Sequence, residues 1–179
     1  MSDIIKIEHL LDGFLQISRL EAEMIHLEPV AASLKNTIIS AVNSIYMKAY
    51  QKNISIELNE FTDLEIPHDP HWTQEALVNV LDNAVKYSDE GGQIIASFTK
   101  LKNVVKFTVR NTTESISVDH VEHIFDRFYR MDRSRNSQTG GYGLGLSIAA
   151  AIVNTHKGKI VAETKDGKYL LITVILPIG

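Results

Sequence analysis

Four glycines lie within the seven residues from Gly140 to Leu146, between a long polar stretch and an apolar one. The polar stretch, residues 126–143, has little apolar periodicity and predicts a surface loop. Loops longer than about 12 to 15 residues are uncommon unless they are functional. The apolar stretch, residues 144–156, predicts a buried helix. Glycines that open a helix expose backbone N–H groups, which favour an anion such as phosphate, although a flexible hinge has the same composition.

Hydrophobic periodicity along the rest of the chain predicts a mixed α+β domain. Further helices are expected over residues 33–52, with Ser33 as N-cap, 71–88 and 118–125. Strands are expected over residues 54–58, 94–99, 104–110, 159–164 and 169–176, and a loop around Pro67 and Pro70. The predicted fold is a two-layer α/β sandwich, in which a mixed, mostly antiparallel sheet of about five strands is covered by three helices.

One long helix is expected to precede this domain. Residues 4–27 carry apolar residues at helical spacing in a narrow seam, which usually packs on another helix. Pro29 ends the pattern, because proline cannot continue a helix and restrains the residue before it. We therefore divide the chain into residues 1–28 and residues 29–179.

Charge and composition exclude several classes of function. The 179 residues carry a net charge of -4, which argues against a broad basic surface for nucleic acid. The chain has no cysteine, so disulfides and cysteine-based metal or redox sites are excluded. No apolar run approaches the roughly 20 residues of a membrane span, and the N-terminus lacks the organisation of a signal peptide. The chain as given is expected to be soluble.

Polar side chains form a stripe on the helix expected over residues 71–88. Asn79, Asn83 and Lys86 are four and three residues apart, and Glu75 extends the stripe by one turn. Amide oxygens and a lysine suit a magnesium–triphosphate complex, because Mg²⁺ takes oxygen ligands and lysine binds phosphate as a point charge. A solvated helix face has the same spacing. The conjunction with the glycine run favours the nucleotide.

Three motifs together closely resemble the asparagine, phenylalanine and second glycine boxes of bacterial sensor histidine kinases. They are Glu75-x3-Asn79-x3-Asn83-Ala84-x-Lys86-Tyr87, then Ile124-Phe125-Asp126-Arg127-Phe128-Tyr129-Arg130, then Gly-Gly-Tyr-Gly-Leu-Gly-Leu from Gly140. The resemblance covers nearly the whole chain. It implies a Bergerat-type ATP site of the kind shared with gyrase, the heat-shock chaperone and mismatch-repair ATPases, with ATP and Mg²⁺ as cofactors.

The resemblance assigns roles to residues of the polar stripe. Asn83 is expected to ligate Mg²⁺, Asn79 to line the metal and phosphate side, and Lys86 and Tyr87 to meet the phosphates. Asn79, Asn83 and Lys86 are thus the expected catalytic residues. Asn79 stands where the hydrolytic relatives carry a glutamate base, and an amide there disfavours attack by water. That difference suits an enzyme that passes phosphate to a protein histidine.

The polar loop from Asp126 to Gly141 resembles the family's ATP lid. It carries four arginines, of which one or two are expected to reach the γ-phosphate and the others to solvate the loop. Phe125 and Phe128 are expected to anchor the lid on the core. The full set expected to bind nucleotide is Asn79, Asn83, Lys86, Tyr87, Asn111, Ile116, Arg130, Arg135, Gly141, Tyr142, Gly143, Leu144, Gly145 and Leu146.

The family's first glycine box, Asp-x-Gly-x-Gly, is altered here to Asn111-Thr112-Thr113-Glu114-Ser115. Asn111 can still accept a hydrogen bond from the adenine amino group, but a neutral bond contributes about 0.5 to 1.5 kcal/mol against about 1.5 to 3 kcal/mol for a charged one. The difference is roughly tenfold in affinity. Its amide donor can offset part of the loss by meeting a ring nitrogen. Thr113 resists the positive φ that glycine adopts freely, so the loop should differ from the family's. ATP is expected to bind weakly, held mainly by its triphosphate.

Residues 10–22 resemble the end of the second helix of the dimerisation and phosphoacceptor hairpin, so residues 1–28 are expected to be its remnant. The acceptor motif His-Glu-Leu-Arg-Thr-Pro is absent, and His9 lacks its context. The chain is therefore expected not to autophosphorylate alone. Expected partners are the phosphoacceptor domain of the same kinase and a response regulator, with no nucleic acid. The parent protein is expected to be a membrane-anchored homodimer with this part on the cytoplasmic side.

Two alternatives remain open from the sequence. The altered first glycine box favours a pseudokinase or regulatory binding module of the same fold, with weak or no ATP binding. The other alternative is an ATPase of the same superfamily. Asn79 and the hairpin remnant both argue against it.

Overall fold

A computed structural model describes residues 11, 18, 27–113, 116–130, 143–165 and 167–179. Its centre is a five-stranded sheet in the order β2-β4-β5-β7-β6, in which β2 runs parallel to β4 and every other neighbour is antiparallel. The strands are β2 (Ser55–Leu58), β4 (Gln93–Lys100), β5 (Val104–Thr112), β6 (Lys159–Thr164) and β7 (Tyr169–Pro177). The predicted mixed, mostly antiparallel sheet is confirmed.

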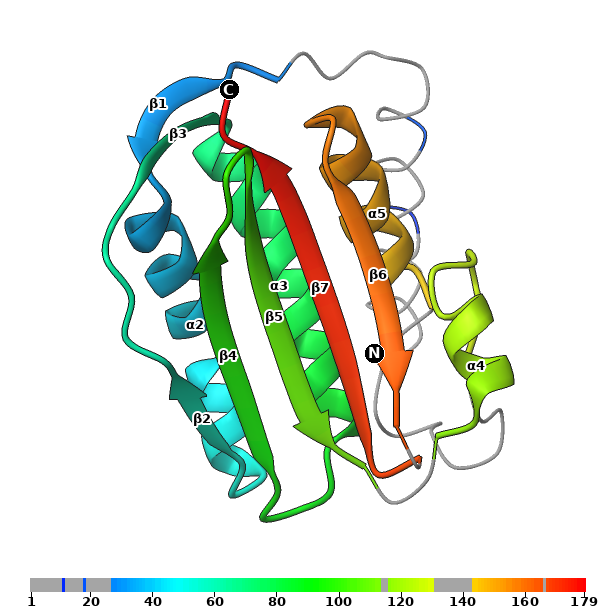
Figure 1. Cartoon of the computed structure of the whole chain (residues 1–179). Coiled ribbons are helices and arrows are strands. Elements are labelled where there is room, and N and C mark those ends of the chain that lie inside the picture. The colour runs from blue at the N-terminus through cyan, green and yellow to red at the C-terminus, as the bar shows by residue number, and fades with distance from the viewer. Residues whose placement is uncertain (1–10, 12–17, 19–26, 114–115, 131–142, 166) are drawn as a thin grey trace.

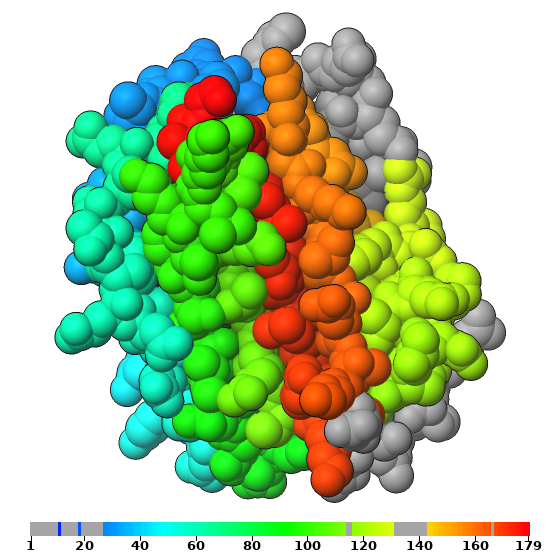
Figure 2. Space-filling model, viewed as in Figure 1, coloured from blue at the N-terminus to red at the C-terminus, as the bar shows by residue number. Residues whose placement is uncertain are grey.

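Three helices cover one face of this sheet, as predicted (Figure 1). They are α2 (Leu34–Gln51), α3 (Pro70–Tyr87) and α5 (Gly145–Thr155). The central helix, α3, packs against both α2 and α5. A fourth, short helix, α4 (Val118–His123), packs beside the edge strand β6. Figure 2 shows the other face of the sheet, where β4, β5, β7 and β6 form a surface that none of the described helices covers.

The core lies between the sheet and the three helices. Leu77, Val80 and Leu81 of α3 are at most 2% exposed, as are Ile94 of β4 and Ile172 of β7. Alternate residues of β5 point into this core, as the period of two requires. The helix starts are capped. The Ser33 hydroxyl accepts from Asn36 N at 3.1 Å, which confirms the predicted N-cap of α2, and Asp69 accepts from Trp72 N at the start of α3.

A second, two-stranded sheet was not predicted. Strands β1 (Val30–Ser33) and β3 (Glu65–His68) pair antiparallel, where the sequence predicted a loop around Pro67. Each strand has only four residues, too few for a periodic signal, and Pro67 argues against a strand. Pro67 is tolerated because it lies in a two-stranded sheet and is exposed, while Ile66 and His68 alternate into the interior. The helix predicted over residues 4–27 lies almost wholly outside the described residues.

Candidate functional site

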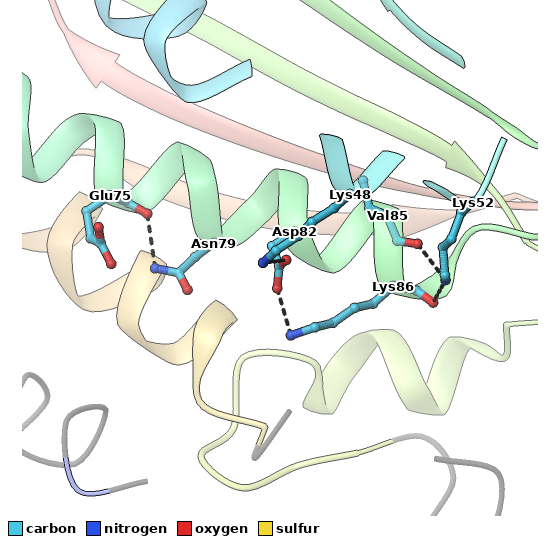
Figure 3. Close-up of polar contacts among 7 residues, drawn as sticks. All are labelled: Lys48, Lys52, Glu75, Asn79, Asp82, Val85 and Lys86. Atoms are coloured by element: carbon cyan, nitrogen blue, oxygen red, sulfur yellow. Dashed lines mark hydrogen bonds and ion pairs between the residues drawn. The ribbon is translucent and has the colours of Figure 1, made fainter. Parts of the chain in front are cut away.

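The predicted polar stripe lies on α3, and its Asn79 faces α5. Asn79 Nδ2 donates to the backbone oxygen of Glu75 at 3.0 Å, one helical turn back (Figure 3). This bond fixes the amide and leaves Oδ1 directed at Gly145, the first residue of α5. A Cβ atom at Gly145 would lie 3.0 Å from that oxygen. The two motifs that the sequence singled out are therefore in contact.

Asn83 presents a buried oxygen that has no hydrogen-bond partner. Among the described residues, its Oδ1 is the one buried side-chain polar atom without a partner. A buried amide oxygen without a donor costs about 1 to 3 kcal/mol, so it calls for a ligand. Mg²⁺ prefers such hard oxygen ligands and keeps several waters of its own. The Asn83 Oδ1 atom is thus a suitable ligand for Mg²⁺, the metal that the resemblance implies.

Lys86, expected at the phosphates, is held by Asp82 on the preceding turn of α3. Lys86 Nζ lies 2.7 Å from Asp82 Oδ2, and Lys48 of α2 lies 2.8 Å from Asp82 Oδ1 (Figure 3). Burial alone would raise the pKa of Asp82, but the bonds from Lys48 and Lys86 outweigh it and hold the pKa below its usual value. Lys52 Nζ donates to the backbone oxygens of Val85 at 2.9 Å and Lys86 at 3.0 Å.

The sequence reasoning missed Asp82, Lys48 and Lys52. Asp82 stands four residues before Lys86, a spacing at which opposite charges pair on a helix, so that signal was present. Lys48 lies on another helix, α2, and Lys52 is the C-cap of that helix, so no local pattern links them to α3.

The glycine run ends against the segment that opens the lid. Phe128 N donates to Gly143 O at 2.9 Å, and Gly143 has a φ of 71°. A Cβ atom at Gly143 would lie 2.4 Å from Tyr129 O, so only glycine fits at this crossing. Gly145 then opens α5, whose N-cap has no side-chain hydrogen bond. A backbone hydrogen bond therefore joins residue 128, near the start of the predicted lid, to residue 143, two positions beyond its predicted end.

Other predicted residues of this region separate into three groups. Leu144 and Leu146 are 5% exposed and pack into the core, so their side chains are structural. Phe125 packs on the core as predicted, but Phe128 is 55% exposed and does not anchor the lid by its side chain. Phe128 adopts a φ of 61°, which turns the chain toward Gly143. Arg133, Arg135, Gly140, Gly141 and Tyr142 lie outside the described residues.

Tyr87 is the last residue of α3, and Arg130 belongs to the predicted lid. Burial raises the pKa of Tyr87, while the positive charge of Arg130 opposes that rise.

The predicted adenine side is formed by the end of β5. Asn111 is 1% exposed, and its Nδ2 donates to Thr112 O at 3.2 Å. Beyond it, Thr113 N donates to Lys168 O at 3.2 Å, and Ile116 N donates to Gly167 O at 3.1 Å. Thr113 does not adopt a positive φ. This segment is therefore fastened to the turn between β6 and β7, and its path does not need a glycine at residue 113.

The structure thus combines a mixed sheet, covered on one face by helices, with a glycine-led helix that contacts the polar stripe of α3. The chain belongs to the family of histidine kinase-, DNA gyrase B- and HSP90-like ATPases, which matches residues 68–179. The resemblance to sensor histidine kinases, the fold and ATP as ligand are thereby confirmed.

Curated sensor kinases are similar to this chain over most of its length. It is 32% identical over 178 residues to the sensor histidine kinase RppB of Synechocystis sp.. This alignment covers 97% of this chain and 38% of that protein. It is 34% identical over 174 residues to the sensor protein VanS of Enterococcus faecium, with 96% and 44% covered. The chain thus spans about two fifths of the length of these relatives.

Solved histidine kinases share the fold. The Acinetobacter baumannii histidine kinase AdeS aligns with a TM-score of 0.81 at 19% identity, over 99% of this chain and 81% of that one. The catalytic domain of the histidine kinase ThkA aligns with a TM-score of 0.68 at 24% identity, over 84% of this chain and 97% of that one. Another ThkA structure, with a TM-score of 0.75 and 21% identity over 97% of this chain and 49% of that one, is a complex with the response regulator protein TrrA.

Membrane-spanning helices and clusters of metal-binding side chains are both absent from the described residues. None of the helices in the described part of the chain is long and apolar enough to cross a membrane. The same residues contain no group of three or more His, Cys, Asp or Glu side chains placed to hold a metal ion.

Proposed function

We propose that this domain transfers the γ-phosphate of ATP to a histidine on a separate phosphoacceptor hairpin. The observation that carries the proposal is the unpaired, buried Oδ1 of Asn83, one turn along α3 from Asn79, which faces the glycine-led α5. Family membership supports ATP, and the sensor kinases among the relatives support histidine as the acceptor. Phosphoryl transfer needs positioning and charge stabilisation more than covalent chemistry, and this face offers both.

Asn83 would hold Mg²⁺, which when bound neutralises charge on the phosphates. Asn79 lines the same side, and Lys86 and Tyr87 contact the phosphates, with Arg130 and Arg135 of the lid as further cations. The Asn79 amide cannot take a proton from water, so the site lacks a base at the position where a hydrolase needs one. The backbone N–H groups of residues 143–146, at the start of α5, would bind the phosphates, and Gly141 and Tyr142 are expected to contribute to the same site.

Asn111 and Ile116 form the adenine side of the proposed site. Because Asn111 Nδ2 is engaged with Thr112 O, its Oδ1 remains as the acceptor for the adenine amino group. Ile116 is 3% exposed and supplies apolar surface behind it.

Phosphotransfer to an acceptor hairpin tests this function. We expect radiolabel from γ-labelled ATP on a separately supplied hairpin, and none on the domain alone. Asn83→Ala should abolish transfer, and chelation of Mg²⁺ should do the same. Weak or absent nucleotide binding together with no transfer would instead support the pseudokinase or regulatory module, which the altered residues Asn111, Thr113 and Ser115 favour. ATP turnover without any acceptor would support a hydrolase.

The partners and location follow from the same proposal. Residues 1–28 would be the remnant of the dimerisation hairpin, and the parent protein a membrane-anchored homodimer with this domain on the cytoplasmic side. A response regulator would receive the phosphoryl group, and the complex of ThkA with TrrA supports a partner of that kind.

A further inference from the structure

The Asp82 carboxylate joins two lysines from different helices. One oxygen pairs with Lys86, one turn further along α3, and the other pairs with Lys48 of α2. The Asp82 side chain is 18% exposed, against 34% for Lys86 and 62% for Lys48. The carboxylate is thus the most enclosed member, and each of its oxygens already has a cation.

Lys86 is held in a particular direction by this pair. Figure 3 shows its side chain folded back along α3 toward Asp82 and the Asn79 end of the helix. Its backbone oxygen is fixed as well, by the Lys52 ammonium at 3.0 Å. A free lysine has several rotamers to lose on binding a ligand, and a lysine already held loses fewer.

The pairing leaves binding capacity on Lys86. An ammonium group has three N–H donors, and a carboxylate oxygen engages one of them. The others remain for oxygens of a ligand. Two lysines against one aspartate also leave the cluster with a net positive charge, which suits an anion next to it.

We propose that Asp82 is a positioning residue that holds Lys86 in place for a phosphate group, and that Lys48 anchors Asp82 from α2. The inference rests on the proposed function, because it gives Lys86 a phosphate to bind. Asp82 itself touches no phosphate. It acts through Lys86, and Lys48 acts through Asp82.

The sign of one substitution separates this role from a simple charge effect. Asp82→Asn removes a negative charge from the neighbourhood of a triphosphate, so charge alone would tighten binding. Loss of the positioning contact would weaken it instead. We expect about tenfold weaker binding, which corresponds to the lower end of the range for one charge-assisted hydrogen bond.

A double-mutant cycle tests whether Asp82 acts through Lys86. The 179-residue chain is titrated with trinitrophenyl-ATP and Mg²⁺ as wild type, Asp82→Asn, Lys86→Met and the double variant. We expect the double variant to bind as Lys86→Met does, because a lysine that is absent cannot be positioned. Adenosine has no phosphate, so its affinity, measured by competition with trinitrophenyl-ATP, should be the same for wild type and Asp82→Asn.

Matched variants control for folding and for charge. Asp63→Asn removes a carboxylate that accepts from Ser33 and Lys35 at the other end of α2, and it should leave binding unchanged. Lys48→Met should weaken binding about twofold, because an exposed ion pair contributes little, and should have no effect in the Lys86→Met background. Lys48→Met carries the test if Asp82→Asn does not fold.

The outcomes are distinguishable. Unchanged or tighter binding by Asp82→Asn, or losses that add in the double variant, would overturn the positioning role and leave the proposed function intact. Wild-type protein that shows no saturation up to millimolar nucleotide would overturn both.

Discussion

Asn79 Oδ1 lies 3.0 Å from the position that a Cβ atom would take on Gly145. The contact joins the polar face of α3 to the first residue of α5, two segments that are 66 positions apart in the sequence (145 − 79). It brings the proposed metal side and the glycine-led helix start into one site.

The first prediction concerns Gly145→Ala. The new methyl group would push Asn79 away, and we expect ATP affinity to fall several-fold. Stability should change little, because the preference of a helix for alanine over glycine, about 1 kcal/mol, offsets the cost of the tight contact with Asn79. Titration with nucleotide and thermal unfolding of the same variant measure the two effects. Gly143→Ala is the contrasting variant, since a φ of 71° and a contact at 2.4 Å with Tyr129 O make it destabilising. Equal affinity of wild type and Gly145→Ala would contradict the role given to this contact.

The second prediction concerns the altered adenine side. Asn111→Asp would restore a charged acceptor, and we expect ATP affinity to rise by up to about tenfold. The same change places a carboxylate oxygen beside Thr112 O, where Nδ2 now donates at 3.2 Å. The nucleotide-free protein should therefore melt at a lower temperature than wild type. An affinity that does not rise would show that Asn111 is not next to the adenine amino group.

Local patterns predict the parts of the site that lie within one element. The spacing of Asn79, Asn83 and Lys86 is enough to define a face of α3, and the glycine run is enough to define the start of α5. Their contact, however, depends on how α3 packs against α5. Periodicity cannot supply that packing, and the family resemblance supplies it instead.

Local sequence patterns do not predict contacts between residues on different helices or strands. Lys48 and Lys52 look like solvated positions on α2, yet both bind α3. Strands β1 and β3 escape because four residues do not establish a period and because Pro67 argues for a loop. Phe128 is expected in the core for its hydrophobicity, but its backbone turns toward Gly143 and leaves the ring exposed.

The third prediction concerns Lys48 in the last turn of α2 and Lys52 at its C-cap. Lys52→Met removes two hydrogen bonds to the last carbonyls of α3, and we expect it to lower the free energy of unfolding by about 1 to 2 kcal/mol. Lys48→Met is the matched control, because the exposed Lys48 pairs with the Asp82 side chain and should cost less than about 1 kcal/mol. Urea denaturation of both variants measures the difference. Equal losses would show that the carbonyl contacts of Lys52 add no stability beyond a surface ion pair.

The last prediction concerns pH. His156 at the end of α5 accepts a hydrogen bond from Asp69 N at 3.2 Å through Nε2, while Nδ1 donates to Ile152 O at 2.9 Å. The ring is thus neutral in the folded state, and burial lowers its pKa below 6.5.

The sign of the pH effect follows from this lowered pKa. Between the folded pKa and 6.5 the unfolded chain binds more protons at this position than the folded chain does, so the free energy of unfolding rises with pH. The contribution of His156 is complete above 6.5 and is lost as the pH falls from 6.5 toward the lower folded pKa. His156→Gln keeps an acceptor for Asp69 N without a titrating ring. Urea denaturation between pH 7.5 and 5 should therefore give a smaller loss of stability for His156→Gln than for wild type, whereas parallel losses would assign the pH dependence to other groups.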